Sequence, residues 1–235
     1  MKIKVVKAQR LYLRIAEQIS FQIQDGSLER GARLPSERDL AHRFQVSRPT
    51  IREAMIALEL AGLVEVRSGS GVYVRESVNF LSDFKYQNDP GPMEILEARL
   101  YFESEAAALA AERITELELG HLDRALRSLC DADSKNKEHE DRQFHLIVAA
   151  ATHNSAIEST VRWLWDLRDR SQVSQYFHER LRSVGIHPAI ADHQLIYRAI
   201  AQRDKVAARS AMKDHLQRVM DVILADESEM TKSSS

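Results

Sequence analysis

The sequence predicts a mainly α-helical protein made of an N-terminal winged helix-turn-helix and a C-terminal antiparallel all-helical bundle. Its 235 residues exceed the length of a typical single domain, and 44% hydrophobic residues are enough for a core in each of two domains. Residues 1–75 combine short helical patterns with a glycine-containing hairpin pattern, whereas residues 93–235 are almost wholly helical in periodicity. The polar, aperiodic stretch 76–92, which ends in Pro-Gly-Pro, is the expected linker.

Charge and composition narrow the function classes. Residues 1–75 hold 13 basic and 8 acidic residues, net +5, and the rest of the chain holds 20 and 27, net −7. A basic segment before an acidic body suits one module for nucleic acid and another for a different task. No stretch approaches the roughly 18 apolar residues of a membrane span, and the N-terminal apolar run is too short for a signal peptide, so we expect a cytoplasmic protein with no membrane partner. The single cysteine, Cys130, excludes an internal disulfide and is expected to be a small core residue on a helix.

Three helical patterns precede the hairpin. The first, over residues 9–25, repeats an apolar side chain every four residues. The second and third lie within residues 34–63 and are joined by a tight turn at Gln45-Val46. Ser36 and Ser47 stand where the N-caps of these two helices belong, so both helix starts are predicted at the serines.

The third helix carries Arg48, Thr50 and Arg52 near its N-terminal end. A helix laid in the DNA major groove presents side chains from this end to base edges and phosphates. Residues 63–74 then change to β-branched residues on either side of Ser-Gly-Ser-Gly, which predicts a two-stranded hairpin with a flexible tip. Three helices followed by such a hairpin make a winged helix-turn-helix, whose wing meets the sugar-phosphate edge or the minor groove.

The second domain is expected to be an antiparallel helical bundle, because no strand-like alternation interrupts its pattern. The expected helices are 93–112, 115–131, 137–152, 155–182, 188–202 and 204–225. Within the bundle, Asp141 and His145 are four residues apart and so project from one helical face. His193 and His215 lie on the last two expected helices.

Convergence of these helices on one cavity would create a ligand set of one carboxylate and three imidazoles. Such a set suits Zn, Ni, Mn or Fe and leaves open coordination positions. Against this, three of nine histidines on helix interiors would not be surprising, and an Asp/His pair four residues apart is more often a surface ion pair. The residue pattern alone leaves both alternatives open.

The motifs Leu-Pro-Ser-Glu-Arg and Val-Ser-Arg-Pro-Thr-Ile-Arg-Glu-Ala, followed by a Gly-rich wing, resemble the DNA-binding domain of the GntR superfamily of bacterial transcription regulators. The resemblance covers about residues 9–75 and implies a homodimer that binds double-stranded DNA at a palindromic operator. The residues that it implies as contacts to bases, phosphates or the minor-groove side are Arg38, Ser47, Arg48, Thr50, Arg52, Ser68 and Gly69. Pro49 departs from the hydroxyl residue of many relatives, which puts a phosphate contact at that position in doubt.

The blocks Asp-x-x-Phe-His, Asp-His-Gln-x-Ile-x-x-Ala-Ile and Met-x-x-His-Leu resemble the FCD effector domain of the FadR-like branch of this superfamily, over residues 93–225. The residues that this resemblance implies as ligands of a divalent metal ion (Zn, Ni or Mn) are Asp141, His145, His193 and His215. Open positions on such an ion suit a small carboxylate effector. Arg99 stands where such regulators offer a guanidinium to the effector, and its alternative is an ion pair with Glu103, four residues on.

Three further blocks resemble the hexuronate-responsive regulators of the UxuR/ExuR type, namely residues 88–100, 143–155 and 163–170. The resemblance implies a sugar acid such as a glucuronate, galacturonate or fructuronate as effector. Trp163 and Trp165 cannot both face a pocket, because they are two residues apart on a helix, so at least one is expected in the core or at a dimer contact. Solvated positions are the alternative for Arg168 and Arg170.

The favoured function is a ligand-responsive transcription regulator that represses genes of sugar-acid catabolism. Its effector would bind more tightly to a bundle state incompatible with operator spacing and so lower the affinity for DNA. One alternative is a DNA-binding regulator whose bundle only dimerises, with structural histidines. The other is a metal-dependent hydrolase or isomerase, against which no carboxylate is placed by motif as a general base.

Overall fold

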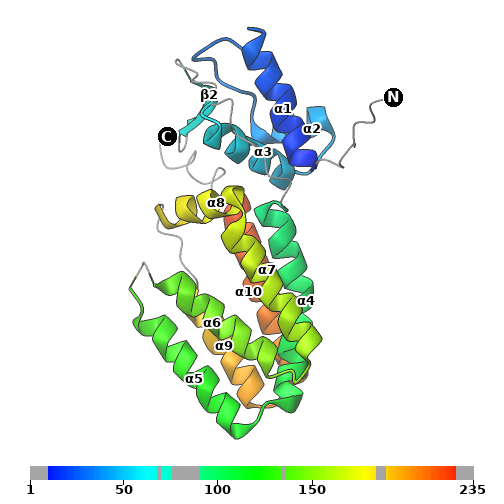
Figure 1. The fold of residues 1–235 in the computed structure, drawn as a ribbon, viewed down its shortest axis with the longest axis vertical. Coiled ribbons are helices and arrows are strands. Elements are labelled where there is room, and N and C mark those ends of the chain that lie inside the picture. Colours follow the sequence, from blue (N-terminus) through cyan, green and yellow to red (C-terminus); the bar gives the residue numbers. More distant parts are fainter. Residues whose placement is uncertain (1–9, 68–69, 76–89, 134–135, 184–188, 226–235) are drawn as a thin grey trace, which may run out of the picture. The chain divides into compact units, whose positions relative to one another are not determined.

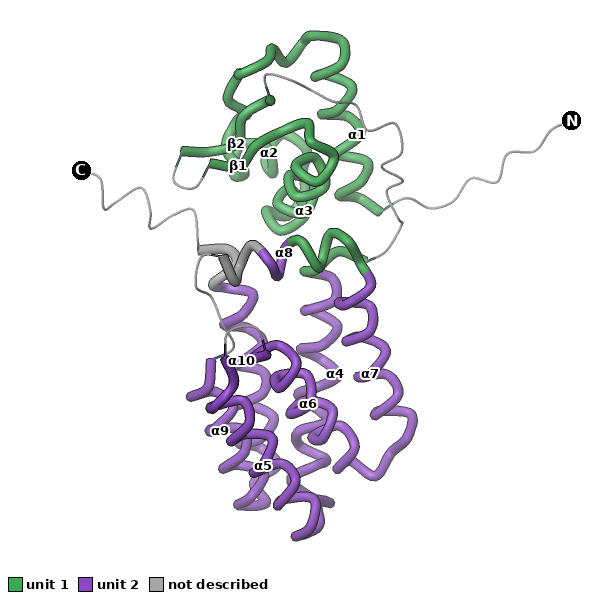
Figure 2. The backbone as a smooth tube through the Cα atoms, turned by 60° about the vertical axis from the view of Figure 1, so that its left-hand side comes forward, with its two compact units in different colours: residues 1–93, 171–176, 224–235 green, residues 94–170, 177–223 purple. Residues whose placement is uncertain are grey.

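The computed structural model describes residues 10–67, 70–75, 90–133, 136–183 and 189–225 (Figure 1). The chain divides into two compact units, which Figure 2 colours separately. The units are residues 1–93 with 171–176 and 224–235, and residues 94–170 with 177–223. Most of the expected linker, residues 76–89, lies outside the described part of the chain. Among the described residues, no helix is both long and apolar enough to cross a membrane.

The first unit contains the predicted winged helix-turn-helix. Its elements are α1 (Leu11–Gln24), α2 (Glu37–Phe44), α3 (Arg48–Leu60), β1 (Val64–Arg67) and β2 (Gly71–Val74). Helix α1 packs against α3, and both turn their apolar faces inward, with Leu13 and Ile51 fully buried. The two strands pair antiparallel, with Val64 opposite Val74. This small core holds α3 as a rigid element with its first turn at the surface.

Local hydrogen bonds set the start of α2 and α3, as the sequence predicts. The Ser36 hydroxyl accepts from the backbone N–H of Asp39 at 3.2 Å and donates to the Asp39 carboxylate at 2.8 Å. The Ser47 hydroxyl accepts from the backbone N–H of Thr50 at 3.3 Å. Between the helices, Gln45 adopts a left-handed conformation with φ of 55°, which reverses the chain within a very short turn. Both predicted N-caps are confirmed.

The second unit is the predicted helical bundle (Figure 1). Its elements, α8 being shared with the first unit, are α4 (Pro92–Arg113), α5 (Glu116–Asp131), α6 (Lys137–Ala150), α7 (Ser155–Arg170), α8 (Gln172–Ser183), α9 (Ile190–Ala201) and α10 (Lys205–Ala225). Helix α5 packs against α6 and α9, and α6 packs against α7. A capping box between Thr115 and Glu118 starts α5. Helix α5 therefore lies beside both α6 and α9.

Two apolar clusters join α7 to its neighbours. The first consists of Leu146, Ala149, Val161 and Trp165 and joins α6 to α7. The second consists of Ile95, Leu164 and Leu167 and joins α4 to α7. Helix α7 therefore bridges the helix that carries Arg99 and the helix that carries Asp141 and His145.

Two sequence-based expectations are wrong. The single helix expected over 155–182 is split into α7 and α8 at Ser171, whose hydroxyl accepts from the backbone N–H of Ser174 at 3.3 Å. A serine that caps a new helix in this way competes with continuation of the old one. Cys130 lies on α5 as expected but is exposed, because it falls beyond the edge of the buried stripe that ends at Leu129.

Candidate functional site

The N-terminal end of α3 presents part of the predicted DNA-contact set at the surface. Arg48 and Ser47 are exposed there, and Arg38 is exposed on α2. The Thr50 hydroxyl lies 2.8 Å from the Ser47 hydroxyl, so the two form one polar point beside the arginines. Exposed guanidinium and hydroxyl groups at a helix N-terminus can contact phosphates and base edges together.

The structure does not place Arg52 with these exposed side chains. Its guanidinium forms a bidentate ion pair with Glu37, with Nε–Oε1 of 2.9 Å and Nη2–Oε2 of 2.7 Å. The side chain of Arg52 is only 11% exposed, and that of Glu37 is 6% exposed. This pair ties the recognition helix α3 to the start of α2, because Glu37 is the first residue of that helix.

Two basic residues, Arg67 in the wing and Arg33 beside it, are not among the DNA contacts that the sequence predicts. Ser68 and Gly69, the predicted contacts at its tip, lie outside the described residues. At the end of β1 nearest the tip, the Arg67 guanidinium lies 4.6 Å from the Tyr73 ring centroid. Arg33, which precedes α2, pairs with Tyr73 of β2 as an isolated bridge. Gly71 has φ of +112°, and a Cβ there would meet the Arg33 side chain at 2.8 Å. The basic charge of Arg33 and Arg67 was the signal in the sequence for a place near DNA, although neither arginine belongs to the two GntR-like motifs.

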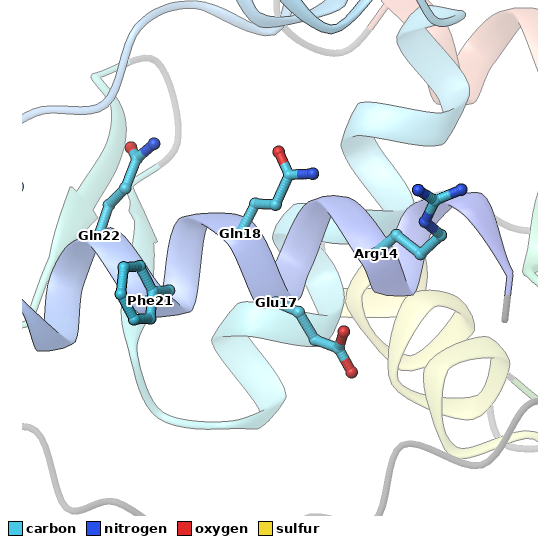
Figure 3. A pocket seen from close by; sticks show the side chains of 5 residues that line it. All are labelled: Arg14, Glu17, Gln18, Phe21 and Gln22. Carbon is cyan, nitrogen blue, oxygen red and sulfur yellow. The ribbon is translucent and has the colours of Figure 1, made fainter. Parts of the chain in front are cut away.

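A shallow pocket of about 360 Å³ lies along α1 (Figure 3). Its lining consists of Arg14, Glu17, Gln18, Phe21 and Gln22. All of these residues belong to one helix, and Phe21 is exposed. We assign it no function, since its lining brings together no convergent groups from several elements.

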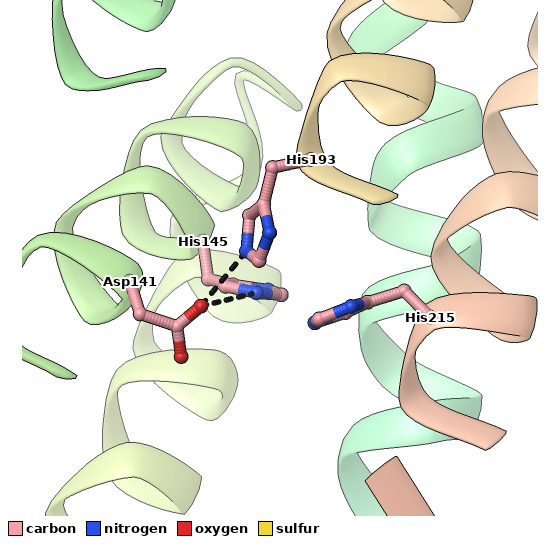
Figure 4. A group of neighbouring side chains, drawn as sticks. All are labelled: Asp141, His145, His193 and His215. Carbon is pink, nitrogen blue, oxygen red and sulfur yellow. Dashed lines mark ion pairs between the residues drawn. The ribbon is translucent and has the colours of Figure 1, made fainter. Parts of the chain in front are cut away.

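In the bundle, the structure brings the four predicted metal-binding side chains together (Figure 4). Asp141 and His145 come from α6, His193 from α9 and His215 from α10. One ligand atom from each lies within 4.8 Å of all the others, and all four residues are buried. Burial excludes the alternative of a surface Asp/His ion pair. The three helices thus bring the four side chains together, which the sequence pattern alone could not show.

Three buried atoms at this point lack hydrogen-bond partners among the described residues. They are Asp141 Oδ1, His145 Nε2 and His193 Nε2. Although Asp141 Oδ1 lies 2.8 Å from His193 Nε2 and 3.7 Å from His145 Nε2, neither contact has hydrogen-bonding geometry. Buried polar atoms are normally satisfied, and a carboxylate oxygen with imidazole nitrogens is a donor set that divalent transition metals prefer. The residues therefore fit a metal ion.

Burial and contacts within the cluster shift the pKa values of three of its members. Burial acts to raise the pKa of Asp141, but the neighbouring imidazoles, His193 first, hold it below the usual range of a carboxyl group. Burial lowers the pKa of His215 to about 4, so this imidazole is neutral at pH 7. Burial also acts to lower the pKa of His193, but Asp141 outweighs it and the pKa is raised. A carboxylate and neutral imidazoles are the forms that bind metals, so Asp141 and His215 have the required charge, whereas at His193, whose pKa is raised, a bound ion competes with a proton.

The other ring nitrogens of the histidines face oxygen atoms. His193 Nδ1 lies 2.9 Å from the backbone carbonyl of Ala189, and His215 Nδ1 lies 3.3 Å from Asp192 Oδ2. Because a carbonyl oxygen only accepts, His193 must carry its proton on Nδ1. When the ring is neutral, its Nε2 lone pair then faces the cluster.

Arg99 lies close to this centre and is 4% exposed. Its Nε donates to Glu103 Oε1 at 2.6 Å, which is the ion pair that the four-residue spacing allowed. The guanidinium also lies 3.7 Å from the ring centroid of Trp165, which is fully buried, whereas Trp163 is 53% exposed. The Trp165 ring in turn lies 5.4 Å from the His145 ring. Arg99 therefore contacts Trp165, which lies beside the metal-binding His145, and also contacts Glu103.

Arg168 is buried, which overturns its solvated alternative, while Arg170 is exposed. The Arg168 guanidinium lies 4.9 Å from the Trp165 ring centroid, and its Nε donates to His178 Nε2 at 3.0 Å. Arg168 also lines a pocket of about 410 Å³ between α6 and α7. Two guanidiniums thus contact one indole beside the cluster. For Arg168, the signal in the sequence was its place in the block 163–170 that resembles the UxuR/ExuR regulators.

Comparison with known proteins identifies the family. The model of the bacterial regulatory proteins of the gntR family matches residues 11–74, and the FCD domain model matches residues 94–218. The Uxu operon transcriptional regulator of Escherichia coli (strain K12) is 36% identical over 226 residues, covering 92% of this chain and 88% of that protein. The Exu regulon transcriptional regulator of the same organism is 34% identical over 223 residues, covering 91% and 84%.

A solved structure, Streptococcus agalactiae GntR, is 28% identical and covers 90% of this chain and all of that one, with a TM-score of 0.47. The two Escherichia coli relatives are transcription regulators, and the similarity to them runs through both the winged helix and the bundle. The metalloenzyme alternative is therefore set aside. The chain belongs to the GntR family of bacterial transcription regulators and carries an FCD domain behind its winged helix-turn-helix.

Proposed function

We propose that this regulator represses genes of sugar-acid catabolism and is released from its operator when a small carboxylate binds beside a divalent metal ion in the bundle. The observation that carries the proposal is the convergence of Asp141 with three imidazoles in a chain that also has an exposed recognition helix. As a regulator of chromosomal genes, it works in the cytoplasm. Zn, Ni and Mn are the metals that this donor set favours.

Asp141, His145, His193 and His215 would hold the ion, which would supply a Lewis-acid site for a carboxylate oxygen. Arg99 supplies a buried guanidinium that can pair with the same carboxylate, since it already pairs with that of Glu103. The motif resemblance and the relatives named for the Uxu operon and the Exu regulon support a hexuronate as the effector. An effector coupling of about 1–3 kcal/mol changes operator affinity roughly 5- to 150-fold.

We further propose a homodimer whose contact uses exposed aromatic residues that continue the packed faces of α4 and α7. Ile95 and Ala98 of α4 pack against α7. Phe102, which is exposed, follows Ala98 by four residues and Ile95 by seven, so it continues the same face of α4. Trp163, also exposed, lies four residues before Leu167 on α7. Exposed aromatic side chains that continue a packed apolar face are typical of subunit contacts. A dimer matches the two-fold symmetry of a palindromic operator.

The metal centre predicts a bound ion that stabilises the fold. Purified protein should contain about one divalent ion per chain by plasma emission spectroscopy, and removal by a chelator should lower its melting temperature. The reason is linkage, which contributes about 2.7 kcal/mol at a free metal concentration 100 times Kd. His193→Ala should lose both the ion and the shift, whereas the control His153→Ala, on an exposed histidine, should keep them. Equal metal content in both variants, or a wild type that never binds metal, would favour a bundle that only dimerises.

The exposed start of α3 predicts a DNA contact by Arg48. Arg48→Ala should weaken binding to a palindrome from the gene's own upstream region and reduce the salt dependence by about one phosphate contact. Arg127→Ala removes an exposed arginine from α5 and should change neither quantity. Fluorescence anisotropy at several salt concentrations measures both. The assignment fails if the two variants bind alike.

The effector prediction concerns Arg99. One of glucuronate, galacturonate or fructuronate should weaken operator binding of the metal-loaded protein roughly 5- to 150-fold. Arg99→Gln should abolish this response and leave operator affinity without effector unchanged, while Arg162→Gln, an exposed arginine on α7, should respond normally. If no hexuronate changes binding, the effector belongs to another class of carboxylate.

The dimer prediction concerns Trp163. Trp163→Glu introduces a charge into the proposed contact and should shift the protein to a monomer in sedimentation equilibrium. Leu117→Glu changes a comparably exposed apolar residue on α5 and should leave the dimer intact. Dimerisation of both variants would place the subunit contact elsewhere.

A further inference from the structure

One buried carboxylate, Glu103, joins the proposed effector arginine to a metal-binding histidine. Glu103 lies in the middle of α4 and is 2% exposed. A buried carboxylate is costly unless both oxygens have partners. Oε1 accepts from Arg99 Nε at 2.6 Å, and Oε2 contacts His145 Nδ1. Each carboxylate oxygen of Glu103 thus has one partner, the Arg99 guanidinium or the His145 imidazole.

The contact with Glu103 determines which nitrogen of His145 carries the proton. A carboxylate paired with a guanidinium is ionised and can only accept hydrogen bonds. His145 must therefore present Nδ1–H to Oε2, which leaves the lone pair on Nε2. That nitrogen faces Asp141 and lacks a hydrogen-bond partner among the described residues. Glu103 thus holds His145 in the tautomer that can bind a metal.

The partners of the other two histidines differ from Glu103. His193 Nδ1 faces the backbone carbonyl of Ala189, which no side-chain substitution removes. His215 Nδ1 faces Asp192 at the longer distance of 3.3 Å, and Asp192 is paired with the half-exposed Arg218 at 2.6 Å. Among the three Nδ1 partners, Glu103 is the side chain that is fully buried. Its removal is therefore the sharpest test of how the ligands are oriented.

We propose that Glu103 is a positioning residue that fixes the tautomer of His145 and thereby links effector binding at Arg99 to metal affinity. The inference rests on the proposed function. Glu103 Oε1 accepts from Nε of Arg99, so an effector carboxylate that binds the Nη groups shares this guanidinium with Glu103 and changes the charge that Glu103 faces. Metal and effector affinities then depend on one shared carboxylate, and such coupling is reciprocal by thermodynamic necessity.

Glu103→Gln tests this with almost no change of shape. Arg99 has only donors, so the amide oxygen of the new side chain should turn to Arg99 and its NH₂ group to His145 Nδ1. An NH₂ group donates, which forces the His145 proton onto Nε2, where it faces the metal-binding cluster. The substitution therefore inverts the tautomer. The matched control is Glu105→Gln, on the same helix, whose carboxylate pairs with Arg209 at the surface.

The experiment measures zinc affinity of the full-length protein by competition with a chelating dye. Glu103→Gln should weaken zinc binding by about 10- to 100-fold, and Glu105→Gln should bind like wild type.

Nitrogen-15 NMR of histidine-labelled metal-free protein reads the tautomer directly. Wild type should show a proton on His145 Nδ1, and Glu103→Gln a proton on Nε2. If Glu103→Gln does not fold by circular dichroism, Glu103→Asp, which keeps the charge but shortens its reach, should also weaken zinc binding.

The outcomes separate this inference from the proposed function. Unchanged zinc affinity and an unchanged tautomer in the folded variant would overturn the role of Glu103 while the metal centre stands. A wild type that binds no divalent metal would overturn the metal centre, and the NMR comparison would still decide whether Glu103 sets the tautomer. A loss of zinc affinity that is equal in the Glu105→Gln control would also contradict the inference.

Discussion

The bundle depends on the burial of a carboxylate among three imidazoles at one point. Asp141 and the histidines come from three helices, so α6, α9 and α10 must approach closely for the cluster to exist. Removing such groups from water is costly, and the cost is met only when opposite charges and hydrogen-bond partners surround them. Around this cluster, each histidine has an oxygen at Nδ1 and an inward-facing Nε2. The polar interior is thus organised around one position that a metal ion fits.

Trp165 connects this polar centre to the apolar core. Its ring packs with Val161 and Leu146 in the cluster that joins α6 to α7, and it also lies beside His145. On its face lie the guanidiniums of Arg99 and Arg168. Stacking on an indole allows a guanidinium to be buried at a smaller cost, because the ring attracts the charge. Two arginines are thereby kept beside the metal-binding cluster in a region that would otherwise exclude them.

The winged helix obeys a different constraint, namely that α3 must be rigid and still expose its first turn. The apolar faces of α1 and α3 supply the rigidity, and the ion pair of Arg52 with Glu37 fixes α3 to α2. Arg52 was expected to contact DNA, whereas in the structure its guanidinium is paired with Glu37 of the same domain. Arg48 differs because it lies at the first position of α3, where the core is out of reach.

The sequence by itself predicted the fold class, nearly every helix and both serine caps, because periodicity and capping are local properties. The resemblance to the FCD domain, and not local spacing, implied the four residues of the cluster. It could not place what depends on distant contacts. The exposure of Cys130 was misjudged because the helices packed against α5 decide how far its buried stripe extends. The break at Ser171 was missed although its cap is local, because the apolar pattern continues through the serine. Glu103 was foreseen only as a partner of Arg99. Its contact with His145 joins residues 42 positions apart, and only the packing of α4 against the rest of the bundle brings those side chains together.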